Sequence, residues 1–157
     1  MVTNPALADL AHLVGRWRME LYNAAFLPDR DHRVAGSFEI DWMEDGSALV
    51  MRQGDSAHPP AATWIIGRDE HEPDYLVLYS DDRGVSRIYR MSFEESRWAM
   101  WRDTREFSQR FNALVDPEMQ AIRGRWEKST DQGATWEHDF NIDYFREGSS
   151  ISSRQSS

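Results

Sequence analysis

Apolar and polar residues alternate along most of this sequence, in short runs separated by turn-forming residues. The alternation begins at Arg16, where Trp17, Met19 and Leu21 alternate with charged residues. Because successive side chains of a strand point to opposite faces, this pattern indicates strands with one buried face. Turn signals recur about every ten residues, a spacing typical of all-β sandwiches and barrels. We expect ten strands, near residues 16–23, 34–43, 47–54, 61–69, 74–81, 85–93, 97–104, 106–113, 120–130 and 134–146.

Each well-patterned hairpin has one aromatic-rich face that must be covered. In one hairpin Phe38, Ile40 and Trp42 meet Leu49 and Met51 on the same face, and the chain has seven Trp, seven Phe and five Tyr in all. Ten such strands need either a partner sheet or closure, and closure also removes exposed strand edges. The sequence therefore predicts an all-β, up-and-down antiparallel barrel of about ten strands.

The first residues predict a short helix that precedes the barrel. Asn4 followed by Pro5 is a helix-start signal, apolar residues then recur at roughly helical spacing, and Gly15 is expected to end the helix. A chain of 157 residues suits one domain, so we assign 1–147 to a single barrel. The Ser-rich tail 148–157 is predicted to be disordered.

Composition argues against several classes of partner. The formal net charge of −9 disfavours nucleic acids and anionic membrane surfaces. Cysteine is absent, which excludes disulfides, thiolate nucleophiles and Cys-ligated zinc. The N-terminus lacks the basic start and long apolar run of a secretory signal, so we expect a cytoplasmic protein.

The stretch Leu10-Ala-His-Leu-Val-Gly15-Arg-Trp17 resembles the opening of lipocalin-like (calycin) barrels. That resemblance implies a barrel whose floor is closed by Trp17. Four later stretches are similar to a bacterial family of lipocalin-like domains of unknown function: Trp64-Ile-Ile-Gly67, Tyr79 to Tyr89, Phe107 to Phe111 and Trp126 to Trp136. The calycin group also includes fatty-acid-binding proteins and nitrobindins. Nitrobindins have a Gly-rich first strand, from which Gly15-Arg-Trp-Arg-Met-Glu20 departs.

Turn chemistry predicts which side chains share the inner face. The sequence Asp81-Asp82-Arg83-Gly84 suits a type I turn closed by a glycine bulge, an ordinary hairpin turn that places Tyr79 opposite Arg87. If Phe93 then lies opposite Arg97, Tyr89 meets Trp101 and Arg87 meets Asp103. In this register Gln109 and Phe111 face inward, while Trp98 and Met100 face outward.

A second turn, at Thr130-Asp131-Gln132-Gly133, predicts the last hairpin. With Thr130 opposite Ala134, Trp126 lies opposite His138. Phe140 and Tyr144 fall on the same inner face.

These faces lead to a hypothesis of ligand binding inside the barrel. Ligand sites commonly combine aromatic walls with a few polar groups. We expect a small apolar or amphipathic molecule as partner and no cofactor. The predicted binding residues are Trp17, Tyr79, Arg87, Tyr89, Trp101, Asp103, Gln109, Phe111, Trp126, His138, Phe140 and Tyr144. Within this set, Arg87 and Asp103 form either a register-fixing ion pair or a head-group site, and His138 is either a core residue or a polar anchor.

Two alternatives stay open. The first is a haem-binding protein or small-molecule enzyme that uses His138 or the pair Arg87 and Asp103. The sequence contains no catalytic motif and no metal-ligand spacing, so a binding protein is favoured over an enzyme. The second is a filled barrel that forms a homodimer or other assembly through exposed Trp98 and Met100.

Overall fold

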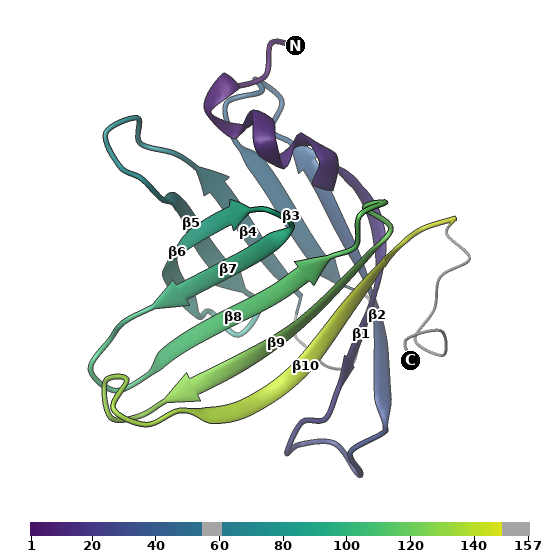
Figure 1. The fold of residues 1–157 in the computed structure, drawn as a ribbon, viewed down its shortest axis with the longest axis vertical. Coiled ribbons are helices and arrows are strands. Elements are labelled where there is room, and N and C mark those ends of the chain that lie inside the picture. The colour runs from purple at the N-terminus through teal and green to yellow at the C-terminus, as the bar shows by residue number, and fades with distance from the viewer. Residues whose placement is uncertain (55–60, 149–157) are drawn as a thin grey trace.

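The computed structural model describes residues 1–54 and 61–148 and contains a closed barrel of ten antiparallel strands (Figure 1). This confirms the predicted all-β fold class and the predicted number of strands. The strands are β1 (Gly15–Tyr22), β2 (Arg33–Trp42), β3 (Leu49–Gly54), β4 (Ala62–Gly67), β5 (Tyr75–Asp81), β6 (Ser86–Glu94), β7 (Arg97–Arg102), β8 (Ser108–Val115), β9 (Ala121–Ser129) and β10 (Glu137–Arg146).

The strands follow one another around the barrel in chain order, and β1 pairs with β10 to close it. Neighbouring strands therefore run in opposite directions, so successive connections lie at alternate ends of the barrel. A helix, η1 (Pro5–Leu13), lies across one end, and the β1–β2 and β9–β10 connections lie at the other (Figure 1). Among the described residues, no helix has the length and apolar character required to cross a membrane. The predicted disordered tail, from residue 149 onward, lies outside the described residues.

The helix closes its end of the barrel with leucine side chains. Asn4 Oδ1 accepts a hydrogen bond from the backbone N–H of Ala6 (3.0 Å) and so caps the helix start. Leu7, Leu10 and Leu13 have at most 1% of their surface exposed and pack on the barrel core. Burial of one such side chain contributes about 2 kcal/mol, so these three anchor the helix.

Trp17 lies beneath this helix and is fully buried. Its Nε1 donates to the carbonyl oxygen of Leu13 (3.0 Å), and the Arg146 guanidinium stacks over its ring at 4.2 Å. Gly15 has a φ of +146°, and a Cβ there would lie 2.5 Å from Arg146 Nη1. A glycine is therefore required where β1 leaves the helix.

The hairpin of β5 and β6 has the predicted register. Gly84 has a φ of +80°, and its N–H donates to the Asp81 carbonyl oxygen (3.0 Å). Tyr79 lies opposite Arg87, as the turn chemistry indicates. This hairpin confirms that the turn residues fix which side chains reach the inner face.

The next hairpin, β6 with β7, differs from the prediction by one residue. Its turn contains only Glu95 and Ser96, both with positive φ (50° and 67°), the conformation of a two-residue hairpin turn. Phe93 consequently lies opposite Trp98, and the predicted pairing of Phe93 with Arg97 is wrong. A shift of one residue exchanges the two faces of a strand.

The exchange buries the apolar face of β7. Trp98 and Met100 are 1% and 3% exposed, so the prediction that they face outward is wrong, as is the assembly surface built on them. Trp101 instead pairs with Arg90 on the outer face, and Asp103 is exposed beyond the end of the strand. The predicted meeting of Arg87 with Asp103 is therefore also wrong. Burial of the large apolar residues explains the shorter turn.

The last hairpin contains a β-bulge that the sequence did not reveal. Trp126 lies opposite Phe140, and the register shifts between His138 and Phe140. His138 is exposed on the outer side, where its Nε2 donates to the Asn23 carbonyl oxygen (3.1 Å). Its predicted place opposite Trp126 is wrong, because β9 and β10 pair one residue away from the predicted register, with Glu137 opposite Lys128 and His138 opposite Glu127. The bulge then inserts one extra residue, Asp139, and so keeps Phe140 and Tyr144 on the predicted inner face.

Candidate functional site

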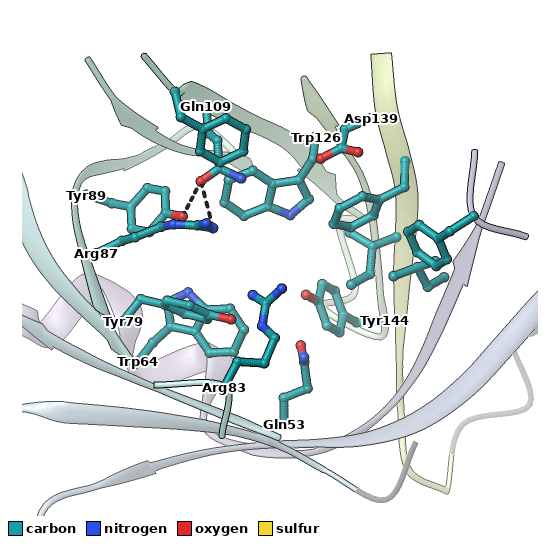
Figure 2. A pocket seen from close by; sticks show the side chains of 15 residues that line it. Gln53, Trp64, Tyr79, Arg83, Arg87, Tyr89, Gln109, Trp126, Asp139 and Tyr144 are labelled. Atoms are coloured by element: carbon teal, nitrogen blue, oxygen red, sulfur yellow. Dashed lines mark hydrogen bonds between the residues drawn. The ribbon is translucent and has the colours of Figure 1, made fainter. Parts of the chain in front are cut away.

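The end of the barrel opposite η1 opens into a cavity of about 380 Å³. Its lining comes from the strand ends that meet there and from the connections between them, so residues distant in sequence surround one space (Figure 2). The lining residues are Leu21, Phe26, Gln53, Trp64, Tyr79, Arg83, Arg87, Tyr89, Phe107, Gln109, Trp126, Asp139, Phe140, Ile142 and Tyr144.

Aromatic rings form most of the wall. Trp64 meets Tyr79 edge-to-face with centroids 4.9 Å apart, and Tyr79 meets Tyr89 at 6.3 Å. The series continues from Tyr89 to Trp126 at 5.7 Å and from Trp126 to Phe140 at 6.3 Å. Each contact of this kind adds about 0.5–1.5 kcal/mol beyond area burial. The rings therefore support one another around the cavity.

A polar cluster is built into this wall on β6 and β8. The Tyr89 hydroxyl donates to Gln109 Oε1 at 2.6 Å, and Arg87 Nη1 donates to the same oxygen at 3.4 Å (Figure 2). Burial raises the pKa of Tyr89, so its hydroxyl stays a donor at neutral pH. The Arg87 guanidinium also lies 4.9 Å from the Phe107 ring. The cluster thus fixes the orientation of a cavity-facing amide.

A second polar group lies at the mouth, on the β5–β6 turn. Arg83 Nη2 pairs with Asp81 Oδ2 at 2.6 Å, and the Tyr79 hydroxyl donates to the same oxygen at 2.6 Å. The Arg83 hydrogen bonds hold the pKa of Asp81 well below its usual range, and burial together with Asp81 raises the pKa of Tyr79. The turn is structural, as predicted, but it also directs Arg83 toward the cavity (Figure 2).

The opposite wall, on β10, carries Asp139 and Tyr144. Burial raises the pKa of Asp139, while Lys128, whose Nζ lies 3.8 Å from its Oδ1, opposes that rise. Burial also raises the pKa of Tyr144. Figure 2 shows the Tyr144 hydroxyl directed toward the interior of the cavity. This wall therefore offers one carboxylate near the mouth and one hydroxyl further inside.

The structure brings together most of the residues predicted to bind a ligand. Those that line the cavity are Tyr79, Arg87, Tyr89, Gln109, Trp126, Phe140 and Tyr144. Phe111 is buried behind Trp126, with ring centroids 5.2 Å apart, and Trp17 lies at the closed end. Trp101, Asp103 and His138 do not line the cavity, for the reasons of register given above.

Other lining residues were absent from the predicted set of binding residues. Leu21, Gln53 and Trp64 continue the alternation of their strands, so the period-two pattern carried the signal for them. Phe26, which belongs to the β1–β2 connection, lines the mouth although half of its surface is exposed. No sequence signal marks Asp139, because its inward position depends on the bulge.

We expect Asp139→Asn and Asp131→Asn to change the pH dependence of stability in opposite directions. Asp139 has a raised pKa in the folded state, so its contribution is present below the ordinary value of 3.8 and is lost as pH rises. Asp131, in the β9–β10 connection, has a pKa lowered to about 2 by hydrogen bonds from Thr135 and Ser129. Its contribution is present above 3.8 and is lost as pH falls.

The measurement is urea denaturation from about pH 3 to about pH 7. Relative to the parent protein, Asp139→Asn should gain stability as pH rises, whereas the deficit of Asp131→Asn should shrink as pH falls. Parallel profiles for the two variants would show that at least one of the carboxylates does not have the environment described.

No family model matches the chain, and no curated protein matches it. Among the described residues, no group of three or more His, Asp or Glu side chains is arranged to hold a metal ion. The proposed function therefore rests on the barrel and its lined cavity.

Proposed function

We propose that the protein binds a small amphipathic molecule in the open end of a lipocalin-like barrel. The observation that carries this proposal is the cavity of about 380 Å³ with aromatic walls and few polar groups. Protein interiors are normally close-packed, so an open space of this size in a barrel of large side chains requires an explanation. A bound molecule supplies one.

The lipocalin-like part of the proposal is supported at the closed end. The resemblance of the Gly15-Arg-Trp17 segment implies a tryptophan at the barrel floor. Trp17 is fully buried there, hydrogen-bonded to the Leu13 carbonyl oxygen and stacked under the Arg146 guanidinium. One closed and one open end suit a barrel that admits a ligand from a single side.

The cavity volume favours a compact ligand. Binding sites for small molecules commonly have volumes of roughly 300–1,000 Å³, and this cavity lies near the lower limit. Phe26 covers part of the mouth from the β1–β2 connection. We therefore propose a ligand of one or two rings.

Binding is favoured over the haem and enzyme alternatives. His138, the residue considered as haem ligand or acid–base group, lies on the outside of the barrel. Arg87 and Asp103 do not face each other, so the proposed acid–base pair is not formed. The polar groups that line the cavity suit the orientation of a bound molecule.

The test uses the fluorescent probe 1-anilinonaphthalene-8-sulfonate, whose emission rises in apolar sites. Ile142→Trp enlarges a side chain that lines the cavity, and Ile65→Trp makes the same change on the outer face, where Ile65 is 37% exposed. We expect the probe to bind the parent protein and Ile65→Trp equally, and Ile142→Trp at least about tenfold more weakly. Unchanged binding by Ile142→Trp, or loss of binding in Ile65→Trp, would contradict the proposed site.

A further inference from the structure

Arg87 is a cavity-lining cation without a partner of opposite charge in the described part of the chain. Its guanidinium contacts are the neutral amide oxygen of Gln109, at the long distance of 3.4 Å, and the Phe107 ring at 4.9 Å. Arg83, by contrast, is held by Asp81 at 2.6 Å. A partly buried guanidinium whose hydrogen-bond and ring contacts are neutral is stabilised by an anion that replaces lost solvent.

The amide of Gln109 adds donors beside this charge. Its oxygen already accepts from Tyr89 at 2.6 Å and from Arg87, which fixes the amide orientation. The NH₂ group is therefore left to point into the cavity, as Figure 2 shows. Arg87 and Gln109 together present N–H donors, and a group that only accepts hydrogen bonds complements them.

Asp139 does not cancel this preference for an anionic, hydrogen-bond-accepting group. Lys128 lies 3.8 Å from its carboxylate, and Arg87 exerts a weaker effect on its pKa than either Lys128 or His138. Arg83 is matched by Asp81 at the mouth. The charge left for a ligand to neutralise is thus the positive charge of Arg87, although the whole chain carries a net charge of −9.

The rest of the wall selects the body of the ligand. Trp64 and Tyr79 lie on one side of the cavity, and Trp126 lies on another (Figure 2). Phe140 lies next to Trp126, with ring centroids 6.3 Å apart. Flat rings gain offset or edge contacts with such walls. The small volume leaves space for a compact body rather than a long chain.

We propose that the cavity selects a compact aromatic molecule with a single carboxylate, the carboxylate accepting hydrogen bonds from Arg87 and the Gln109 amide. This rests on the proposed function and specifies its ligand class. Charge-assisted hydrogen bonds to a guanidinium are stronger than neutral ones. An aromatic acid should therefore bind more tightly than its neutral amide of the same shape.

The experiment is isothermal titration calorimetry with 2-naphthoate and 2-naphthamide at neutral pH. The full chain should bind the acid at least about tenfold more tightly than the amide. Arg87→Met, which removes the charge and keeps much of the volume, should bring the two affinities to within about twofold, chiefly by weakening the binding of the acid. Arg97→Met, at an exposed position of β7, is the matched control and should keep the preference.

The outcomes separate the two proposals. Equal affinity of the parent protein for acid and amide would overturn the carboxylate assignment while leaving the binding function intact. A preference that persists in Arg87→Met would also overturn it. If the parent protein binds neither compound, the proposed function itself fails for aromatic ligands of this size.

If Arg87→Met does not fold, the salt dependence of ligand binding by the parent protein provides the test. In the parent protein, about 1 M NaCl should weaken binding of 2-naphthoate and leave 2-naphthamide unaffected, because salt screens only the charged pair. Equal responses of the two compounds to salt would overturn the assignment.

Discussion

Replacing Trp98 by alanine is expected to lower the free energy of unfolding by about 3–5 kcal/mol. Trp98 is 1% exposed and packs edge-to-face on Phe111, with ring centroids 5.1 Å apart, and against Tyr144 at 6.3 Å. Truncation would remove this contact area and leave a cavity in the middle of the core. Urea denaturation of the purified variant measures the loss.

Trp101→Ala is the matched control, since it makes the same chemical change three residues along β7. Trp101 pairs with Arg90 on the outer face and is partly exposed. We expect its loss to cost less than about 1 kcal/mol. The register predicted from the sequence requires the reverse order, so a larger effect at Trp101 would show that β7 is paired as the sequence suggested.

Gly124→Ala should destabilise the barrel by about 1–3 kcal/mol despite the addition of a single methyl group. A Cβ at Gly124 would lie 2.5 Å from Phe111 Cε1 and 3.1 Å from the Ala113 Cβ. The Phe111 ring must therefore move, and Trp126, which it supports, lines the cavity. We expect weaker binding of aromatic probes as well as a lower midpoint of urea unfolding.

Two controls separate crowding from the general effect of replacing glycine. Gly67→Ala adds its methyl group where nothing lies within 4 Å, so it should be neutral or slightly stabilising. Combining Gly124→Ala with Phe111→Leu should cost less than the two single changes together, because the smaller side chain makes room. Additive losses would indicate that the two residues do not compete for the same space.

The alternation of apolar and polar residues was sufficient to predict the barrel because the period of two holds along most of the strands. It also identified the inward residues of β5, β6 and β9. The turn at 81–84 fixed the register between β5 and β6. Tyr79, Arg87 and Trp126 were therefore found among the cavity residues before the fold was known. In these strands, the turn residues and the burial of apolar side chains favour the same inward face.

The errors arose where two arrangements differ by one residue in a turn. The segment Glu94-Glu95-Ser96 has no glycine or proline to favour one turn length, and the alternation alone fits either choice. Burial of Trp98 and Met100 decides between them, and that depends on the whole core. Similarly, His138 was placed inside because β10 pairs with β9 one residue away from the predicted register, with Glu137 opposite Lys128. Asp139 was not predicted because the bulge before Phe140 depends on tertiary packing.

The most direct test of the cavity as a binding site is the crystal structure of the protein grown with saturating 2-naphthoate. The proposal predicts the naphthalene rings in the space between Trp64 and Trp126, with the carboxylate within hydrogen-bond distance of Arg87. Naphthoate bound only on the outer face of the barrel, or a cavity holding only water at saturation, would contradict it.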